Sequence, residues 1–156
     1  MDKFIGDSAM ILFGVPEETP DHAARAVRCA WLIQALVHRI NQLRKTKAEE
    51  PIKLRIAINS GPMLAGNIGI PDRLEYTVVG DTVNLASRLC CLAPADGIML
   101  GESTAAQAEV NEMVELHKQP PIKVRGRRTL VTPAIVGRPK PALFDSMHHI
   151  LERAEA

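Results

Sequence analysis

The sequence predicts an α+β domain in which helices cover a β-sheet. Three observations lead to this prediction. Apolar residues recur at spacings of three and four in the longer segments, which is typical of helices that bury one face. Shorter apolar runs that end at glycine or proline indicate strands. The elements follow one another in the mixed order β-β-α-β-β-α-β-α-β-β, which favours an α+β sandwich.

The size and composition fit one such domain. The chain has 156 residues, of which 46% are apolar and 24% charged, so it can bury a core and stay soluble. A net charge of +1 and few aromatic residues (one Trp, one Tyr, three Phe) do not indicate a nucleic-acid binder. No apolar run approaches the roughly 18 residues of a membrane span, and the start does not resemble a signal peptide.

The first predicted elements are a strand pair within residues 2–14 and a long helix. The step Gly6-Asp7 separates two apolar runs, and glycine permits the backbone angles of a tight turn. The loop VPEETPD follows, and its two prolines forbid a continued strand. Asp21 is expected to cap a helix that runs to about Lys45. The apolar face of this helix contains Val27, Ala30, Ile33, Val37 and Ile40.

The middle of the chain alternates between short strands and a second helix. Residues 54–58 form a strand that stops at the turn SGP. A segment of small residues, MLAGNIG, then leads to a turn at IPDR and a strand at LEYTVVG. Asp81 or Thr82 is expected to cap the helix TVNLASRLCCLA, which Pro94 closes. Residues 98–100 form a further short strand.

The last part of the chain is expected to contain a short helix from about Ser103 and strands at 114–117, 122–124 and 131–136. The motif RPKP is typical of a linker, and DSMHHILERAEA is typical of a helix start. We therefore expect one domain over residues 1–138 and a linker with a helical tail over 139–156. This tail would connect the domain to another part of a longer protein.

Three cysteines, Cys29, Cys90 and Cys91, lack the CxxC spacing of metal or redox sites. We expect them to be reduced and mostly buried, because small apolar thiols are common in cores. Reduced thiols favour a cytoplasmic location.

A few polar side chains lie in segments where chemistry is plausible. Asp7, at the hairpin turn, either accepts hydrogen bonds from turn N–H groups or binds Mg²⁺. Asn84 and Arg88 are four residues apart and share one face of the second helix, near an N-terminus that favours anions. This pair either belongs to a solvated helix face or positions a sugar and neutralises a phosphate.

Three blocks in this order, DKFIGD, LRIAINSGPMLAGNIG and EYTVVGDTVNLASRL, resemble the catalytic domain of class III nucleotidyl cyclases. The resemblance extends over about residues 2–138 and implies a ferredoxin-like sandwich of the βαββαβ type. It also implies formation of 3′,5′-cyclic AMP and pyrophosphate from ATP at a homodimer interface, with Mg²⁺ or Mn²⁺ in a two-metal site. Residues 62–76 match a dimer arm of the family.

The resemblance further implies roles for the polar residues above. Asp7 matches one of the two metal-binding aspartates of the family. Lys3 and Thr77 match the pair that recognises adenine, where guanylyl cyclases typically have Glu and Cys. Asn84 matches the residue that orients the ribose, and Arg88 matches the arginine that stabilises phosphate charge in the transition state.

The family also grips the terminal phosphates with a basic residue near the last hairpin. Arg125 and Arg127 in the run VRGRR are the candidates, and a solvated basic turn is the alternative. In family dimers the sites are composite, so Lys3 and Asp7 of one chain are expected to serve two different sites.

One block of the family is not found in the sequence. Nothing in it resembles the strand F-x-D-I-x-G-F-T, which carries the first metal aspartate and lies centrally in the family's sheet. We expect a truncated product or an internal start codon, so that this strand and the helices after it are missing. Unpaired strand edges would then lead to swapped or abnormal oligomers. The alternative function is a cyclase-derived module that dimerises and binds nucleotide but catalyses little.

Overall fold

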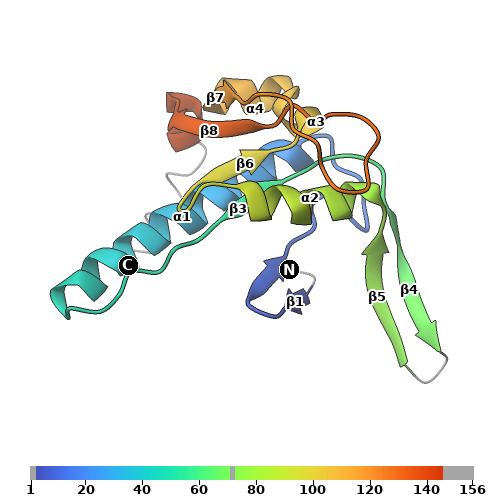
Figure 1. Ribbon diagram of the computed structural model, residues 1–156, viewed down its shortest axis with the longest axis horizontal. Helices are drawn as coiled ribbons and strands as arrows, with labels where there is room; N and C mark the ends of the chain where they lie inside the picture. Colours follow the sequence, from blue (N-terminus) through green and yellow to red (C-terminus); the bar gives the residue numbers. More distant parts are fainter. Residues whose placement is uncertain (1–2, 71–72, 146–156) are drawn as a thin grey trace.

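A four-stranded mixed sheet lies at the centre of the computed structural model, which describes residues 3–70 and 73–145 (Figure 1). Its strands are β3 (Ile56–Ile58), β6 (Ile98–Leu100), β8 (Ala134–Pro139) and β7 (Val114–Lys118), in that spatial order. The β3–β6 pair is parallel, whereas β8 is antiparallel to both of its neighbours. The predicted mixed sheet is therefore present.

Helices cover both faces of this sheet. On one face, α1 (His22–Thr46) and α4 (Ala108–Met113) pack against Ile98 and Leu100 of β6. On the other face, α2 (Asp81–Leu92) packs against Met99. This alternation along β6 follows from the period of two residues in a strand. The predicted α+β sandwich is thus confirmed. Between β6 and α4 lies the short helix α3 (Glu102–Ala105), so the single helix predicted from Ser103 is in fact two.

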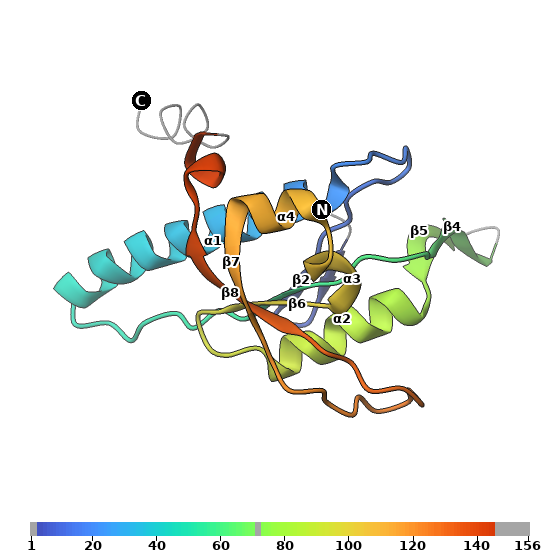
Figure 2. The same ribbon diagram turned by 90° about the horizontal axis from the view of Figure 1, so that it is seen from above.

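Helix α1 matches its predicted bounds, but only part of its apolar face is covered. Val27 and Ala30 are buried, whereas Ile40 is 44% exposed because the C-terminal half of the helix extends beyond the sheet (Figure 2). Asp21 occupies the N-cap position, as predicted, but it does not cap the helix through its side chain. Its side chain makes no capping hydrogen bond, and its carboxylate instead lies 3.7 Å from the Arg28 guanidinium.

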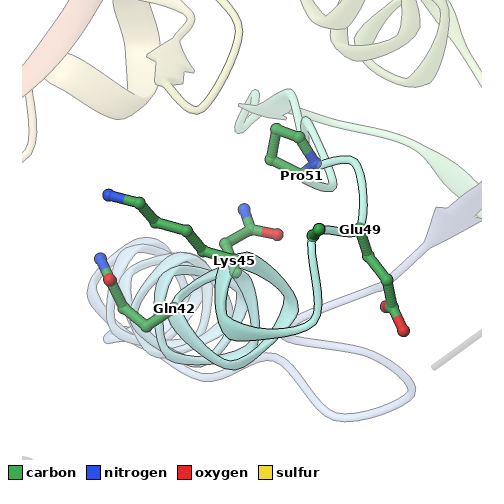
Figure 3. A pocket seen from close by; sticks show the side chains of 6 residues that line it. Gln42, Lys45, Glu49 and Pro51 are labelled. Atoms are coloured by element: carbon green, nitrogen blue, oxygen red, sulfur yellow. The ribbon is translucent and has the colours of Figure 1, made fainter.

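A shallow pocket of about 320 Å³ lies at the C-terminal end of α1 (Figure 3). It is lined by Asn41, Gln42, Lys45, Ala48, Glu49 and Pro51. None of these is a candidate site residue, and this end of α1 lies at the opposite side of the molecule from the start of α2 (Figures 1 and 2). The pocket is therefore not part of the predicted site.

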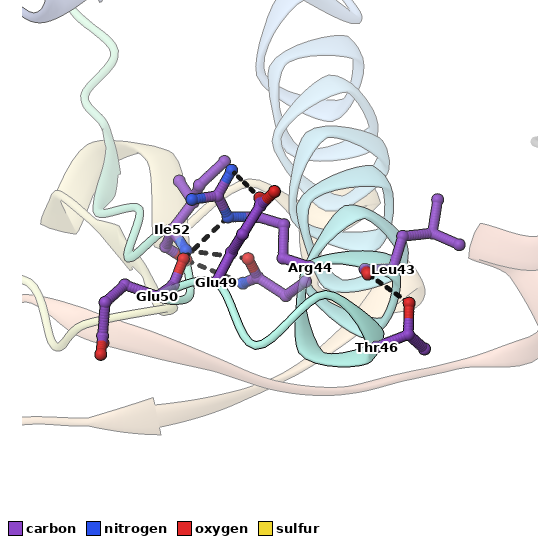
Figure 4. Close-up of polar contacts among 7 residues, drawn as sticks. Leu43, Arg44, Thr46, Glu49, Glu50 and Ile52 are labelled. Carbon is purple, nitrogen blue, oxygen red and sulfur yellow. Dashed lines mark hydrogen bonds and ion pairs between the residues drawn. The ribbon is translucent and has the colours of Figure 1, made fainter.

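Polar contacts fix the path of the chain after α1 (Figure 4). The Arg44 guanidinium contacts the Glu49 carboxylate at 3.0 Å and donates to the Glu50 carbonyl at 2.7 Å. The Asn41 amide donates to the carbonyl of Ile52 and accepts from its N–H, both at 2.8 Å. These contacts direct the chain back along α1 toward β3.

The N-terminal hairpin forms a sheet of its own. Strands β1 (Lys3–Ile5) and β2 (Ser8–Met10) pair around the Gly6-Asp7 turn, as predicted. Within residues 3–70 and 73–145, neither strand pairs with the four-stranded sheet (Figure 1).

Strand β3 has one hydrogen-bonded neighbour, β6, among the residues that the structure describes. The Ile56 N–H and the Ile58 carbonyl bond toward β6. Because successive residues of a strand direct their backbone groups to opposite sides, Arg55 and Ala57 face the other edge. There the Cys90 thiol donates a weak hydrogen bond to the Arg55 carbonyl at 3.5 Å. One edge of β3 is therefore not paired with another strand in the described part of the chain, as expected for one neighbour of the missing strand.

A second hairpin, β4 (Leu64–Ile70) and β5 (Arg73–Val79), projects away from the sheet (Figure 1). Its pairing runs from Leu64↔Val79 to Ile70↔Arg73. The segment MLAGNIG, predicted only as a run of small residues, is therefore largely a strand. Its low β-propensity is overridden by the backbone pairing with β5.

The C-terminal elements differ from their prediction in detail. Ile122 and Val131 form an isolated bridge instead of two strands, and β8 begins only after Pro133, which lacks a donor for the ladder. Leu143 is fully buried in the core against α1, and the Phe144 ring packs edge-on to Trp31 at 6.0 Å. The predicted boundary at residue 138 stays a prediction, and residues 146–156 lie outside the described part.

All three cysteines are free thiols, as predicted. Cys29 and Cys90 are half-buried, but Cys91 is exposed, so the expectation that the thiols are mostly buried is wrong for Cys91. Burial raises the pKa of the Cys90 thiol, and the adjacent Cys91 raises it further. No helix in residues 3–70 and 73–145 is long and apolar enough to span a bilayer.

Candidate functional site

The first turn of α2 is anchored by hydrogen bonds to the segment that follows β3. The Asn59 amide donates to the Thr82 carbonyl at 3.0 Å, and the Thr82 hydroxyl donates to the Pro62 carbonyl at 2.7 Å. The prediction that Asp81 or Thr82 caps the helix through its side chain is therefore wrong, because both side chains have other partners. The anchored turn gives α2 a fixed position on the sheet.

Asp81, Asn84 and Arg88 share one face of α2, because they are separated by three and four residues. Leu85 and Leu89, on the adjacent side of the helix, are buried in the core. Asn84 is exposed and Arg88 is half-buried. The predicted pairing of Asn84 with Arg88 on one face is therefore compatible with a ligand at the surface of α2.

The Arg88 guanidinium lies against a tight turn in the run VRGRR. The Arg127 N–H donates to the Val124 carbonyl at 3.1 Å, and Gly126 has a φ of +78°. A Cβ atom on Gly126 would lie 3.2 Å from Arg88 Nη2 and 3.3 Å from Nη1. Only glycine combines this backbone angle with so close an approach of a guanidinium.

Arg127, in the same turn, forms an ion pair with Asp81 on α2. Its Nη2 atom lies 2.9 Å from Asp81 Oδ2, and the two side chains are 31% and 56% exposed. Arg125 is exposed, and no ion pair is found for it in the described part of the chain. Arg88 and the two arginines of the turn therefore form a basic surface with one carboxylate, which suits an anion with several charges.

The other predicted site residues lie on separate elements. Lys3 is in β1 opposite Met10, and Asp7 lies exposed at the turn of the same hairpin. Thr77 is half-buried in β5, opposite Gly66. Among the predicted site residues, the structure brings only Arg88 together with the turn that contains Arg125 and Arg127.

A single carboxylate marks the predicted metal position. Within residues 3–70 and 73–145 there is no group of three or more His, Cys, Asp or Glu side chains that could together hold a metal ion. Asp7 by itself fits one ligand of a Mg²⁺ ion whose other ligands are waters and substrate phosphates.

Three contributors to the site were not recognised from the sequence. No sequence pattern indicates a role for Asn59 or Gly126, because that role depends on contacts with segments distant in the sequence. Asp81 was expected only as a helix cap, and the partner Arg127 could not be foreseen from spacing.

Comparison with known families decides what kind of domain this is. A sequence model described as the adenylate and guanylate cyclase catalytic domain matches residues 3–137. The chain belongs to this family. Adenylate cyclase 1 of Rhizobium meliloti is 32% identical over 127 residues, which cover 81% of this chain and 19% of that protein. The chain thus spans about a fifth of the length of the curated relatives it matches.

Solved cyclase structures have the same fold. The adenylyl cyclase CyaB from P. aeruginosa superposes with a TM-score of 0.81 at 27% identity, over 90% of this chain and 72% of that chain. The guanylate cyclase domain of RhGC from Catenaria anguillulae, in complex with GTP, has a TM-score of 0.68 at 32% identity, over 82% and 66%. The expected class III cyclase fold is therefore confirmed, and the similar structures include both adenylyl and guanylyl cyclases.

Proposed function

We propose that this cyclase domain acts on ATP and forms 3′,5′-cyclic AMP and pyrophosphate. The observation that supports this most directly is the position of Arg88, one helical turn from Asn84 and against the basic turn 124–127. In this reaction the ribose 3′-hydroxyl attacks the α-phosphate, and the bond to the pyrophosphate leaving group breaks. A site for it needs a group that orients the ribose and cations that hold the phosphates.

The arrangement on α2 meets these requirements. The Asn84 amide has donors and an acceptor for a ribose hydroxyl, and the Arg88 guanidinium is a planar fork for phosphate oxygens. Negative charge grows on these oxygens in the transition state, so a fixed cation there lowers the barrier. Exposed Arg125 is the better placed of the two turn arginines for the terminal phosphates, because Arg127 is paired with Asp81.

Lys3 and Thr77 are proposed to give the site its specificity for ATP over GTP. A lysine ammonium only donates hydrogen bonds, so it matches an accepting ring nitrogen of adenine. The Thr77 hydroxyl would accept from the exocyclic amine of the same base. Adenylyl cyclases of the family resemble this chain at both positions, whereas guanylyl cyclases typically have Glu and Cys there.

Mg²⁺ or Mn²⁺ is proposed as the cofactor, with Asp7 as one protein ligand. When bound, the metal lowers the pKa of the attacking hydroxyl and neutralises charge on the leaving phosphates. The active form is proposed to be a cytoplasmic homodimer with composite sites, in which Asp7 of one protomer faces Arg88 of its partner.

The test is nucleotide cyclisation by the purified domain with ATP or GTP and Mn²⁺. We expect cyclic AMP, little cyclic GMP, and loss of activity in the Asp7→Ala and Arg88→Ala variants. Cyclic GMP as the main product would contradict the adenine assignment. Equal activity in wild type and Arg88→Ala would contradict the proposed site.

The alternative, a module that binds nucleotide and dimerises with little catalysis, is favoured by one observation. The hairpin that contains Asp7 is separate from the main sheet, and Asp7 belongs to no group of three or more metal-binding side chains in the described residues. Mixing the chain with a longer adenylyl cyclase whose transition-state arginine is replaced by alanine tests this. Recovered activity would mean that this chain supplies Arg88 to a site whose carboxylates come from the partner.

A further inference from the structure

We infer that Asp81 and Arg127 form a clasp that positions Arg88, so that Asp81 is a positioning residue of the phosphate site. This inference rests on the proposed function. The pair joins the first residue of α2 to a turn far away in the sequence at 2.9 Å. By contrast, the Arg28–Asp21 and Arg44–Glu49 pairs are local contacts at the ends of α1.

On the helix side of the clasp, the start of α2 is held by hydrogen bonds to another segment of the chain. Asp81 lies next to Thr82, whose hydroxyl and carbonyl are both hydrogen-bonded to residues 59–62. A carboxylate in the first turn of a helix is also favoured by the helix dipole. Because the backbone next to Asp81 is fixed to residues 59–62, we infer that Asp81 holds the turn in place, rather than the turn holding the helix.

On the other side of the clasp, the turn 124–127 determines how much space the Arg88 guanidinium has. Gly126 lies between Arg125 and Arg127, and both terminal nitrogens of Arg88 approach it closely. A shift of the turn therefore changes the space available to the Arg88 guanidinium. The clasp also neutralises Arg127, whereas no ion pair is found for Arg88 or Arg125 in the described part of the chain.

The direction in which one substitution changes the affinity for an anion distinguishes a positioning role of Asp81 from a purely electrostatic one. Removing a negative charge beside a basic surface strengthens the binding of an anion if only Coulomb attraction matters. If Asp81 positions the arginines, the Asp81→Asn variant instead binds the anion more weakly. The probe is inorganic tripolyphosphate, measured by calorimetry without metal, so that neither the base nor Asp7 contributes.

We expect Asp81→Asn to weaken tripolyphosphate binding by about three- to tenfold. The exchanged pair, Asp81→Arg with Arg127→Asp, should recover most of this loss because it restores the clasp in reverse. Glu109→Gln is the matched control, since Glu109 is also an exposed carboxylate in the first turn of a helix. It should bind the probe like the wild type.

A second measurement covers the case in which the exchanged pair does not fold. Asp81→Asn and Arg127→Gln should destabilise the fold by less in combination than the sum of their separate effects, because they remove the same contact. Additive effects, unchanged binding or tighter binding in Asp81→Asn would each overturn the inference. A wild type that binds tripolyphosphate but forms no cyclic nucleotide would overturn only the proposed function.

Discussion

Replacement of Gly126 by alanine tests the contact between Arg88 and the basic turn. The substitution has two separable costs. At a φ of +78°, a residue with a Cβ atom is strained by about 1–2 kcal/mol. In a domain of this size, each kcal/mol lowers the melting temperature by about 2–4 °C, so we expect a decrease of roughly 2–8 °C.

The second cost falls on the site. The new Cβ would lie 3.2 Å from Arg88 Nη2, which is closer than ordinary van der Waals contact, so the guanidinium must move by a few tenths of an ångström. Because a misplacement of about 1 Å can cost about 100-fold in rate, we expect up to about a tenfold loss of cyclisation. Tripolyphosphate binding should weaken in the same range.

Gly6→Ala is the matched control for this experiment. Gly6 has a similar φ of +63°, but a Cβ there would have no neighbour within 4 Å. It should lose similar stability in thermal unfolding and bind tripolyphosphate like the wild type. If both variants lose the same stability and Gly126→Ala still binds the anion normally, the proposed dependence of Arg88 on the turn is refuted.

Four further predictions address the transition state, the base and the thiols. Arg88→Ala should lower the rate of cyclisation by about 10²–10³-fold with an unchanged melting temperature, measured by product formation and thermal unfolding. Lys3→Glu combined with Thr77→Cys should shift the preference from ATP toward GTP in a competition assay. Iodoacetamide should label exposed Cys91 faster than Cys90, as read by mass spectrometry. Burial raises the pKa of the Cys90 thiol, so the folded state favours the protonated thiol. The stabilisation from this preference is fully present below the ordinary thiol pKa and is lost as the pH rises through the raised pKa. The free energy of unfolding of the wild type should therefore fall more steeply in this pH range than that of Cys90→Ser.

Local patterns were sufficient to predict the helices and most strands. The bounds of α1 and α2 follow from apolar spacing and from prolines close to their ends, which depend only on neighbouring residues. The strand β4 was missed because glycine and small residues give no strand signal, and its partner β5 supplies the structure. Helix caps failed for a similar reason, since Asp81 and Thr82 bond to distant segments instead of their own helix.

The site was predictable in its chemistry and not in its geometry. Asn84 and Arg88 could be placed on one face from their spacing alone. That Arg127, and not Arg125, is paired with a carboxylate depends on how the turn 124–127 folds over α2. No rule of spacing or composition contains that information.

The open edge of β3 has a consequence for hydrogen exchange along this strand. The Ile56 amide bonds to the Gly97 carbonyl, so its proton should exchange slowly with deuterium. The neighbouring Ala57 amide faces the open edge of β3, where the Cys90 sulfur lies nearby in place of a strand carbonyl. Because sulfur is a weak acceptor, the Ala57 proton should exchange much faster. Any strand that docks there, from a second copy or from another segment, would slow Ala57 and leave Ile56 unchanged. One amide in the middle of the domain would thus report whether the sheet is complete.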